Sequence, residues 1–403
     1  MRIVLGLMSG TSGDGVDMAA VAVRGTGQSM RVRFLWHEHR SFGRSLRRRL
    51  LEVMAPATIR TEELARLNIE LGNVYGRAVV AAINKYAHVG RPELIGVAGQ
   101  TVCHLPDRRA GRTVTFQIGE PARVAAATGL CTVGGFRQSD TAAGGQGAPL
   151  VPWTDWILMR SRRVSRAIQN IGGIGNVTWL PAAGGPETIQ AFDTGPGNML
   201  IDALAEIASG GRQRMDRGGQ RAARGRILEG VLKRWMKHPF LRLAPPRTTG
   251  RETFGKVFVE AELPRLRASS RSADDWLATA TAYTARSIAE AYRRYLPGFQ
   301  AVCSVTPSEE RRAAKVYVRK MLDLPEIIVC GGGAHNPTLL DMLSMAFGGA
   351  CIRSIDSLGI PAQAKEAVSF AILAAARMDL TPANVPKATG ARQAAVLGQV
   401  IVP

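Results

Sequence analysis

The stretch GLMSGTSGDGVD, residues Gly6–Asp17, joins two apolar runs of the chain through a turn rich in glycine, hydroxyl and carboxylate groups. The first run spans Ile3 to Leu7 and the second spans Val16 to Val23. Short apolar runs bounded by turn residues predict a buried strand, a polar turn and a returning strand. The glycine-rich loops of P-loop and dinucleotide-binding proteins open into a helix instead, and neither of their signatures is present in this stretch.

A hairpin turn of this composition suits a nucleotide triphosphate. Its backbone N–H groups and the hydroxyls of Ser9, Thr11 and Ser12 can reach phosphate oxygens. Asp14 or Asp17 can hold a hydrated Mg²⁺, which prefers few carboxylates and many waters. Taken alone, a turn of glycine, serine and aspartate is more often an ordinary hairpin turn. The nucleotide interpretation therefore depends on the rest of the chain.

The length and composition predict a globular protein of two domains. The chain has 403 residues, of which 46% are hydrophobic and 21% charged. Its apolar runs are far shorter than the roughly 20 residues that span a membrane, and its N-terminus lacks the layout of a signal peptide. The 5 cysteines are scattered without a CxxC pair. This pattern is typical of a reduced cytoplasmic protein and argues against a zinc site.

The formal net charge of +20 raises the question of a nucleic-acid partner. The arginines are spread along the chain, and no aromatic residues interleave with the dense runs as a single-strand-binding groove requires. We therefore expect an arginine-rich surface that favours anionic substrates such as ATP rather than a nucleic-acid site. The densest basic runs are Arg47–Arg49, Arg160–Arg163 and Arg212–Arg226.

The remaining first part of the chain predicts alternating strands and helices. A long helix from Thr61, its proposed N-cap, to Ala87 has an apolar stripe at helical spacing. Polar groups in Gly99–His104 follow a short buried strand, which is where open α/β sheets build sites. The other predicted elements are strands at Met30–Trp36, Leu94–Val97 and Cys131–Phe136, a basic helix at Gly43–Met54 and an alanine-rich helix after Pro121.

The second half of the chain repeats the opening pattern. The strand Ala167–Ile171 enters a turn at Gly172 and Gly173, and Val177–Leu180 returns from it. A strand at Thr188–Phe192 then ends in Asp193–Asn198 and is followed by a helix. Later elements are a helix at Ser272–Leu296 with Ser272 and Asp275 as a capping box, strands at Glu326–Val329 and Ala350–Ile355, a helix capped by Asn336 or Thr338, and a helix at Pro361–Met378.

Two strand–turn–strand units and a late glycine turn predict an α/β protein of two lobes that binds ATP in the cleft between them. We place the boundary near residue 135, giving lobes 1–135 and 136–403, with the C-terminal segment able to pack on the first lobe. Asp193, at the end of a strand, is the natural general base, although a turn or N-cap aspartate is an equally common reading of this position. The residues expected to surround the nucleotide in the second lobe are Gly172, Gly173, Gly331, Gly332, Gly333 and Asn336.

Several of these stretches together resemble the anhydro-N-acetylmuramic acid kinases. The resemblance covers nearly the whole chain in the right order. It implies the fold of the hexokinase–Hsp70–actin superfamily, with duplicated ribonuclease H-like domains, and a cytoplasmic, usually dimeric enzyme of cell-wall recycling. The matching stretches are Gly6–Asp17, Gly144–Pro152, Asn170–Val177, Phe192–Asn198, Thr248–Glu252, Cys330–Asn336, Gly359–Pro361 and Lys365–Glu366.

The resemblance also implies a reaction and roles for single residues. The family opens the 1,6-anhydro bridge of the sugar with water and phosphorylates O6 from MgATP, giving N-acetylmuramic acid 6-phosphate. By this resemblance Asp193 deprotonates the attacking water, and Glu366 lies near the sugar or the metal. The residues matching the ATP phosphate segment are Ser9, Gly10, Thr11, Ser12, Gly13, Asp14, Gly15, Val16 and Asp17, and those matching the sugar-side loops are Gln100, Thr101, Arg137 and Asp140.

The chain departs from the family pattern at three positions. Ala98 stands where the family commonly has histidine, Gly135 where it has aspartate, and Gly218 replaces the second carboxylate of an Asp-x-Asp-Gly run that begins at Asp216. Each change removes a hydrogen-bonding group near the expected substrate. A kinase for the simpler anhydrosugar levoglucosan is the close alternative, since the motifs above also resemble those of levoglucosan kinases. A catalytically silent protein that binds a polyanion is the alternative of a different class.

Overall fold

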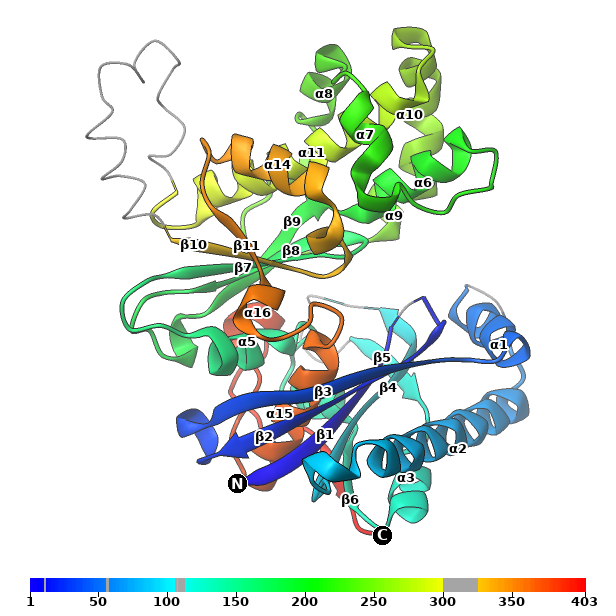
Figure 1. Cartoon of the computed structure of the whole chain (residues 1–403), viewed down its shortest axis with the longest axis vertical. Helices are drawn as coiled ribbons and strands as arrows, with labels where there is room; N and C mark the ends of the chain where they lie inside the picture. The colour runs from blue at the N-terminus through cyan, green and yellow to red at the C-terminus, as the bar shows by residue number, and fades with distance from the viewer. Residues whose placement is uncertain (11, 56–57, 106, 108–112, 300–324) are drawn as a thin grey trace. The chain divides into compact units, whose positions relative to one another are not determined.

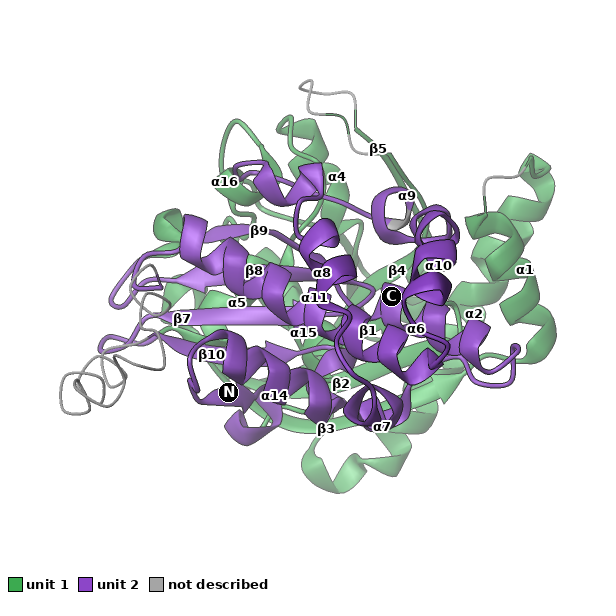
Figure 2. Ribbon diagram, turned by 90° about the horizontal axis from the view of Figure 1, so that it is seen from above, with its two compact units in different colours: residues 1–160, 185–189, 359–403 green, residues 161–184, 190–358 purple. Residues whose placement is uncertain are grey.

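The computed structural model describes residues 1–403 except residues 11, 56–57, 106, 108–112 and 300–324. The chain forms two compact units, coloured separately in Figure 2. Unit 1 comprises residues 1–160, 185–189 and 359–403, and unit 2 comprises residues 161–184 and 190–358. The boundary expected near residue 135 falls inside unit 1, because the helix α5 (Val151–Met159) packs against α15 (Lys365–Met378) of the same unit. The C-terminal segment belongs to unit 1 as well.

Unit 1 is built on a mixed sheet in the strand order β12-β6-β4-β1-β2-β3, with β5 paired to β4. Strand β2 pairs antiparallel with both β1 and β3, while β4 runs parallel to β1 and to β6. The hairpin of β1 and β2, which lie side by side in Figure 1, is the strand–turn–strand unit that the sequence predicted. The strands are β1 (Arg2–Ser9), β2 (Gly15–Arg24), β3 (Arg31–Ser41), β4 (Leu94–Leu105), β5 (Val114–Ile118), β6 (Cys131–Gly134) and β12 (Gln399–Ile401).

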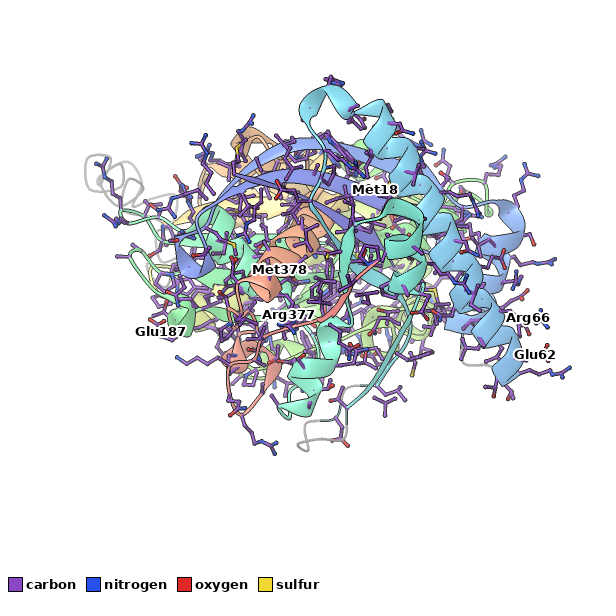
Figure 3. The ribbon with its side chains drawn as sticks, turned by 90° about the horizontal axis from the view of Figure 1, so that it is seen from below. Met18, Glu62, Arg66, Glu187, Arg377 and Met378 are labelled. Carbon is purple, nitrogen blue, oxygen red and sulfur yellow. The ribbon has the colours of Figure 1, made fainter. Side chains whose placement is uncertain are left out.

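The two faces of β1 contact different helices because side chains alternate along a strand. Leu5 and Leu7 join the core formed with α1 (Arg44–Met54) and α2 (Thr61–Lys85), and the predicted apolar stripe of α2 is buried there. Gly6, on the opposite face, lies against α15. The solvent side of α2 carries charged pairs such as Glu62 and Arg66, labelled in Figure 3, whose side-chain atoms lie 2.7 Å apart.

Unit 2 repeats this sheet in the order β11-β10-β7-β8-β9, again with an antiparallel hairpin region followed by parallel strands. The duplicated two-lobed α/β fold expected from the sequence is thus confirmed. Its strands are β7 (Arg166–Ile171), β8 (Ile174–Leu180), β9 (Gln190–Pro196), β10 (Glu326–Cys330) and β11 (Ile352–Ser354). Its helices are α6 (Asn198–Ala208), α7 (Gln220–Arg224), α8 (Glu229–Trp235), α9 (Arg251–Phe254), α10 (Lys256–Ser269), α11 (Ala273–Tyr295) and α14 (Pro337–Ala346).

Several predicted element ends differ from the structure. The strand at Cys131 stops at Gly134, because Gly135 takes a left-handed conformation with φ of 64° and α4 (Phe136–Ala142) begins after it. Thr61 is the first helical residue of α2 rather than its N-cap. At the start of α11 the expected capping box is absent, since Ser270, not Ser272, donates to the Asp275 carboxylate.

The sequence predicts that the glycine-rich polar residues 212–226 are mobile and that the charged residues 298–320 form an excursion from the fold. Residues 212–226 contain α7 and are tied to α11 through the pairs that Arg221 and Arg224 make with Asp274. The expected excursion at residues 298–320 falls almost entirely outside the described residues. Among the residues that are described, no helix combines the length and apolar character needed to cross a membrane.

Candidate active site

The turn between β1 and β2 is a compact reverse turn. The Gly13 N–H donates to the Gly10 carbonyl at 3.1 Å, and Gly13 has φ of 57°, where glycine is favoured. The exposed Asp14 carboxylate accepts a hydrogen bond from Ser12 Oγ at 2.7 Å. Thr11 lies outside the described residues. The predicted phosphate turn is therefore a glycine hairpin turn with an exposed hydroxyl and carboxylate.

Ser9 and Gln100 form hydrogen bonds with each other and with the backbone of this turn. Both side chains are buried, and the Ser9 hydroxyl lies 2.5 Å from Gln100 Oε1. Gln100 Nε2 donates to the Gly10 carbonyl at 3.0 Å. Gln100 was predicted to bind the sugar, but its amide is occupied with the turn and has no accessible surface. Thr101, the next residue of β4, is half-buried beside Gln117 of β5.

Asp17, at the start of β2, is held by two histidines of the neighbouring strand. Its Oδ1 lies 2.9 Å from His37 Nε2 and 3.1 Å from His39 Nδ1. The close pairing requires Gly15, where a Cβ atom would come within 2.5 Å of the His39 ring. No cluster of three potential metal-binding side chains occurs within the described residues. Asp14 and Asp17 carry carboxylates, the ligand type that Mg²⁺ prefers in proteins.

The N-terminal turn of α15 is anchored beside β1. A Cβ atom at Gly6 would lie 1.9 Å from the Ala367 carbonyl oxygen, so only glycine permits this approach. Lys365 is buried and forms an ion pair with the buried Asp155 at 2.9 Å. The residue between these anchors, Glu366, leaves its side chain accessible to solvent.

Glu366 lies within electrostatic reach of the phosphate turn. The surrounding protein displaces enough water to raise the pKa of the Glu366 carboxyl above its ordinary value. The positive charges of Lys365 and Arg137 oppose this rise, and the Asp17 carboxylate adds to it. Unit 1 therefore brings Asp17, Arg137 and Glu366 into one charged neighbourhood.

Arg137 and Asp140, both on α4, differ in their surroundings. Arg137 is half-buried, donates to the Gly147 carbonyl at 2.9 Å, and has its pKa lowered by burial against the opposing effect of Glu366. Burial, together with the Arg137 charge, lowers the pKa of His104 to about 4, so His104 is neutral at pH 7.

Asp140 is fully buried. Its carboxylate accepts hydrogen bonds from the Gly147 N–H at 2.8 Å, Asn384 Nδ2 at 2.7 Å and Thr389 Oγ1 at 2.8 Å. The sequence placed Asp140 among the sugar ligands. In the structure it instead joins the glycine loop after α4 to the C-terminal segment, and it presents no surface to a ligand.

In unit 2 the turn between β7 and β8 packs against the start of α6. The Gly172 carbonyl accepts the Asn198 N–H at 2.7 Å, and the Gly173 carbonyl accepts the N–H groups of Gly197 and Met199 at 3.0 and 3.1 Å. A Cβ atom at Gly197 would lie 2.3 Å from the Gly172 oxygen. The glycines thus allow the end of β9 and the first turn of α6 to approach this hairpin.

Asp193 is the most strongly perturbed carboxylate in this region. Burial raises its pKa to about 7, although the Thr249 N–H and the Arg247 charge oppose the rise and Glu252 adds to it. The Thr249 N–H donates to Asp193 Oδ2 at 2.7 Å. A half-buried carboxylate that is held through one oxygen and titrates near neutral pH has the properties of a general base.

The glycine turn after β10 fits closely against β7. Gly331 has φ of 78°, and a Cβ atom there would lie 2.6 Å from Asn170 Oδ1. Asn336 caps α14 by accepting the Leu339 N–H at 3.0 Å, which confirms one of the two predicted caps. Gly219 allows the segment before α7 to reach this cap, because a Cβ atom there would lie 2.1 Å from Asn336 Oδ1.

The sequence did not single out His37, His39 or Arg247 as neighbours of the site. The two histidines lie beyond the strand predicted at Met30–Trp36, and only the extension of β3 to Ser41 in the structure places them on one face. Arg247 was recognised only as part of a cationic loop. Its burial, with 1% of its surface exposed, could not be inferred from an arginine between proline and threonine.

Comparisons with known proteins agree on one family. The sequence model of the family described as anhydro-N-acetylmuramic acid kinase matches residues 2–304 and 313–403. A protein of that name from Caldanaerobacter subterraneus is 38% identical over 99% of this chain and 96% of its own length. Proteins of the same name from Synechococcus elongatus and Bacillus cereus are 40% and 37% identical, over 98% and 99% of this chain and the same shares of their own lengths.

Proposed function

This chain belongs to the anhydro-N-acetylmuramic acid kinase family, and we propose from this premise that it converts 1,6-anhydro-N-acetylmuramic acid, water and ATP into N-acetylmuramic acid 6-phosphate and ADP. Water oxygen forms a bond to C1 while the C1–O6 bond breaks. O6 then forms its bond to the γ-phosphorus as the bond to the ADP oxygen breaks. The proton of the attacking water must pass to a base.

The base in this proposal is Asp193, and its environment is the observation that supports the mechanism best. A carboxylate with a pKa of about 7 is ionised in a large fraction of molecules at neutral pH, yet it is basic enough to take a proton from water. The bond from the Thr249 N–H fixes Oδ2, so the carboxylate keeps one orientation. Such positioning contributes to the rate because the reacting groups need no reorganisation.

The turn Gly10–Asp17 and the glycine turns of unit 2 are the proposed sites for ATP. The exposed Ser12 hydroxyl and the backbone N–H groups of the first turn suit phosphate oxygens. Asp14 and Asp17 are the proposed Mg²⁺ ligands, directly or through water. When bound there, Mg²⁺ supplies positive charge that offsets the charge of the ATP phosphates.

Arg137 and Glu366 are the proposed polar groups for the sugar in unit 1. Among the described residues, no carboxylate lies within 4.0 Å of the Arg137 guanidinium, so its charge is available to an anionic or hydroxyl-rich ligand. The accessible Glu366 carboxyl can accept a sugar hydroxyl. Gln100 and Asp140 act indirectly in this scheme, by holding the turn at Gly10 and the loop at Gly147.

The experiment is ADP release by the purified protein with MgATP and one anhydrosugar at a time. We expect turnover with 1,6-anhydro-N-acetylmuramic acid to exceed turnover with levoglucosan by a wide margin. Comparable turnover with both sugars would contradict the proposed substrate. Salt-sensitive binding of nucleic acid without sugar-dependent ADP release would instead identify a polyanion-binding protein.

We also propose that the enzyme is a cytoplasmic homodimer, as the family resemblance implies. The molar mass in solution, measured by light scattering, tests the dimer directly. A mass of 43.2 kDa at all concentrations would show a monomer.

A further inference from the structure

Arg247 is an arginine inside the protein. Only 1% of its surface is exposed, which is rare for an arginine without an ionic partner. Among the described residues, no carboxylate oxygen lies within the 4.0 Å of an ion pair with it. Its Nη2 atom is buried without a hydrogen-bond partner. A buried, unpaired charge is costly, so this guanidinium calls for a physical explanation.

The guanidinium is held by backbone carbonyls and aromatic rings. Nη1 donates to the carbonyls of Leu241 and Leu243 at 3.2 and 2.9 Å. The guanidinium carbon lies 5.0 Å from the ring centre of Phe240 and 5.1 Å from that of Tyr295. These contacts orient the group and partly compensate its charge. None of these carbonyls and rings carries a full negative charge that would balance the guanidinium.

The remaining contacts lead to Asp193. Arg247 Nε donates to the Asp193 carbonyl at 2.8 Å, and the Asp193 N–H donates to the Arg247 carbonyl at 3.1 Å. Two residues further along the loop, the Thr249 N–H holds the Asp193 side chain. The loop is thus fastened to Asp193, in the middle of β9, through its N–H, its carbonyl and its side chain.

We propose that Arg247 is a positioning residue for the general base: its buried guanidinium fixes the backbone of Asp193 and supplies a positive charge that favours the ionised form of the Asp193 carboxylate. This inference rests on the proposed role of Asp193. It explains why a charge is buried here without a salt bridge, since a direct ion pair would occupy the carboxylate that must accept a proton.

The charges acting on Asp193 come from one segment. Arg247 favours the ionised form and Glu252 disfavours it, and both lie between η5 (Pro239–Arg242) and the end of α9. On the adjacent strand β8, the residue opposite Asp193 is the uncharged Asn176. Removal of the Arg247 charge therefore leaves the Thr249 N–H as the remaining group that favours the ionised form among those that shift this pKa, and the carboxylate becomes harder to ionise.

The test compares pH–rate profiles of kcat/KM for the wild type, Arg247→Gln and Arg247→Lys. Gln keeps an amide donor for the backbone carbonyls but removes the charge, whereas Lys keeps the charge but not the planar set of donors. Arg242→Gln is the matched control, because Arg242 is an exposed arginine in the same segment. Thermal unfolding shows which variants are folded.

We expect Arg247→Gln to move the acidic limb of the profile upward by at least half a pH unit and to regain activity at high pH. We expect Arg247→Lys to keep the wild-type limb while kcat falls, and Arg242→Gln to match the wild type throughout. The proposal would be overturned if folded Arg247→Gln kept the acidic limb of the wild-type profile. It would also be overturned if the acidic limb of Arg247→Lys moved upward by as much as that of Arg247→Gln. If Arg247→Gln does not fold, wild-type kcat in Arg247→Lys overturns the positioning role.

Different variants test the role of Asp193 as the base and the role of Arg247 as its positioning residue. An Asp193→Asn variant with wild-type turnover would refute Asp193 as the base, whatever Arg247 does. An inactive Asp193→Asn variant together with unchanged profiles in the Arg247 variants would keep the base and refute only the inference about Arg247.

Discussion

Substitution of Gly6 by alanine tests how α15 positions Glu366. The added Cβ atom would lie 1.9 Å from the Ala367 carbonyl oxygen and 2.6 Å from the Ala371 nitrogen, both in the helix backbone. Ordinary contact begins at 3.4 Å, so α15 must move away from β1 by roughly 1.5 Å. Glu366 precedes Ala367 and has to move with it.

The expected changes in melting temperature and in kcat have separate causes. Overpacking of this kind costs about 1–3 kcal/mol of folding free energy. At about 2–4 °C per kcal/mol, the melting temperature should fall by about 2–12 °C. Displacement of a catalytic group by about 1 Å can cost on the order of 100-fold in rate, so we expect kcat to fall roughly 10- to 100-fold.

The assay is thermal unfolding together with steady-state ADP release. Gly43→Ala is the control in the same unit, because a Cβ atom at Gly43 meets nothing within 4 Å and its φ of −61° is allowed to alanine. The control should lose no more than about 1 kcal/mol, from the weaker N-cap. If Gly6→Ala keeps the melting temperature and kcat of the control, the close packing of α15 does not position Glu366 for the reaction.

Three further predictions concern titration and buried polar groups. Because the pKa of Asp193 is raised from 3.8 to about 7, kcat/KM should fall as the pH drops below 7, and folding stability should decrease as the pH rises from 4 to 7; a pH series of activity and urea unfolding measures both. Lys365→Met leaves the Asp155 carboxylate buried without its cation and should lower the free energy of unfolding by about 3–5 kcal/mol in urea titration. Asp140→Ala removes three buried hydrogen bonds and should destabilise the protein by about 2–4 kcal/mol in the same assay; a large rise in KM at unchanged stability would show a sugar ligand instead.

The two hairpins could be read from the sequence because each joins two apolar runs through a glycine turn. Other elements carried no such signal. Helix α5 was not predicted, since its segment VPWTDWILM is buried on nearly every side and lacks the polar face that marks an amphipathic helix. Strand β5 was not predicted, because it is a short strand whose Val114 and Phe116 are exposed.

The candidate site was predictable where it depends on local turns and not where it depends on tertiary contacts. The neighbourhood of Asp17 and Glu366 follows from two motifs far apart in the sequence, and only the family resemblance connected them. Nothing in one sequence distinguishes an aspartate that faces a ligand from one that is enclosed, so Asp140 was assigned to the sugar. The support of Asp193 by Arg247 depends on a loop that folds back over β9.

The most direct test of the central claim is ADP formation by the Asp193→Asn variant with saturating MgATP and 1,6-anhydro-N-acetylmuramic acid, with ATP affinity measured on the same sample. Loss of the base should lower turnover by about 10²–10⁴-fold while ATP affinity stays within a few-fold of the wild type. Wild-type turnover in this variant would contradict the assignment of Asp193 as the base that activates water.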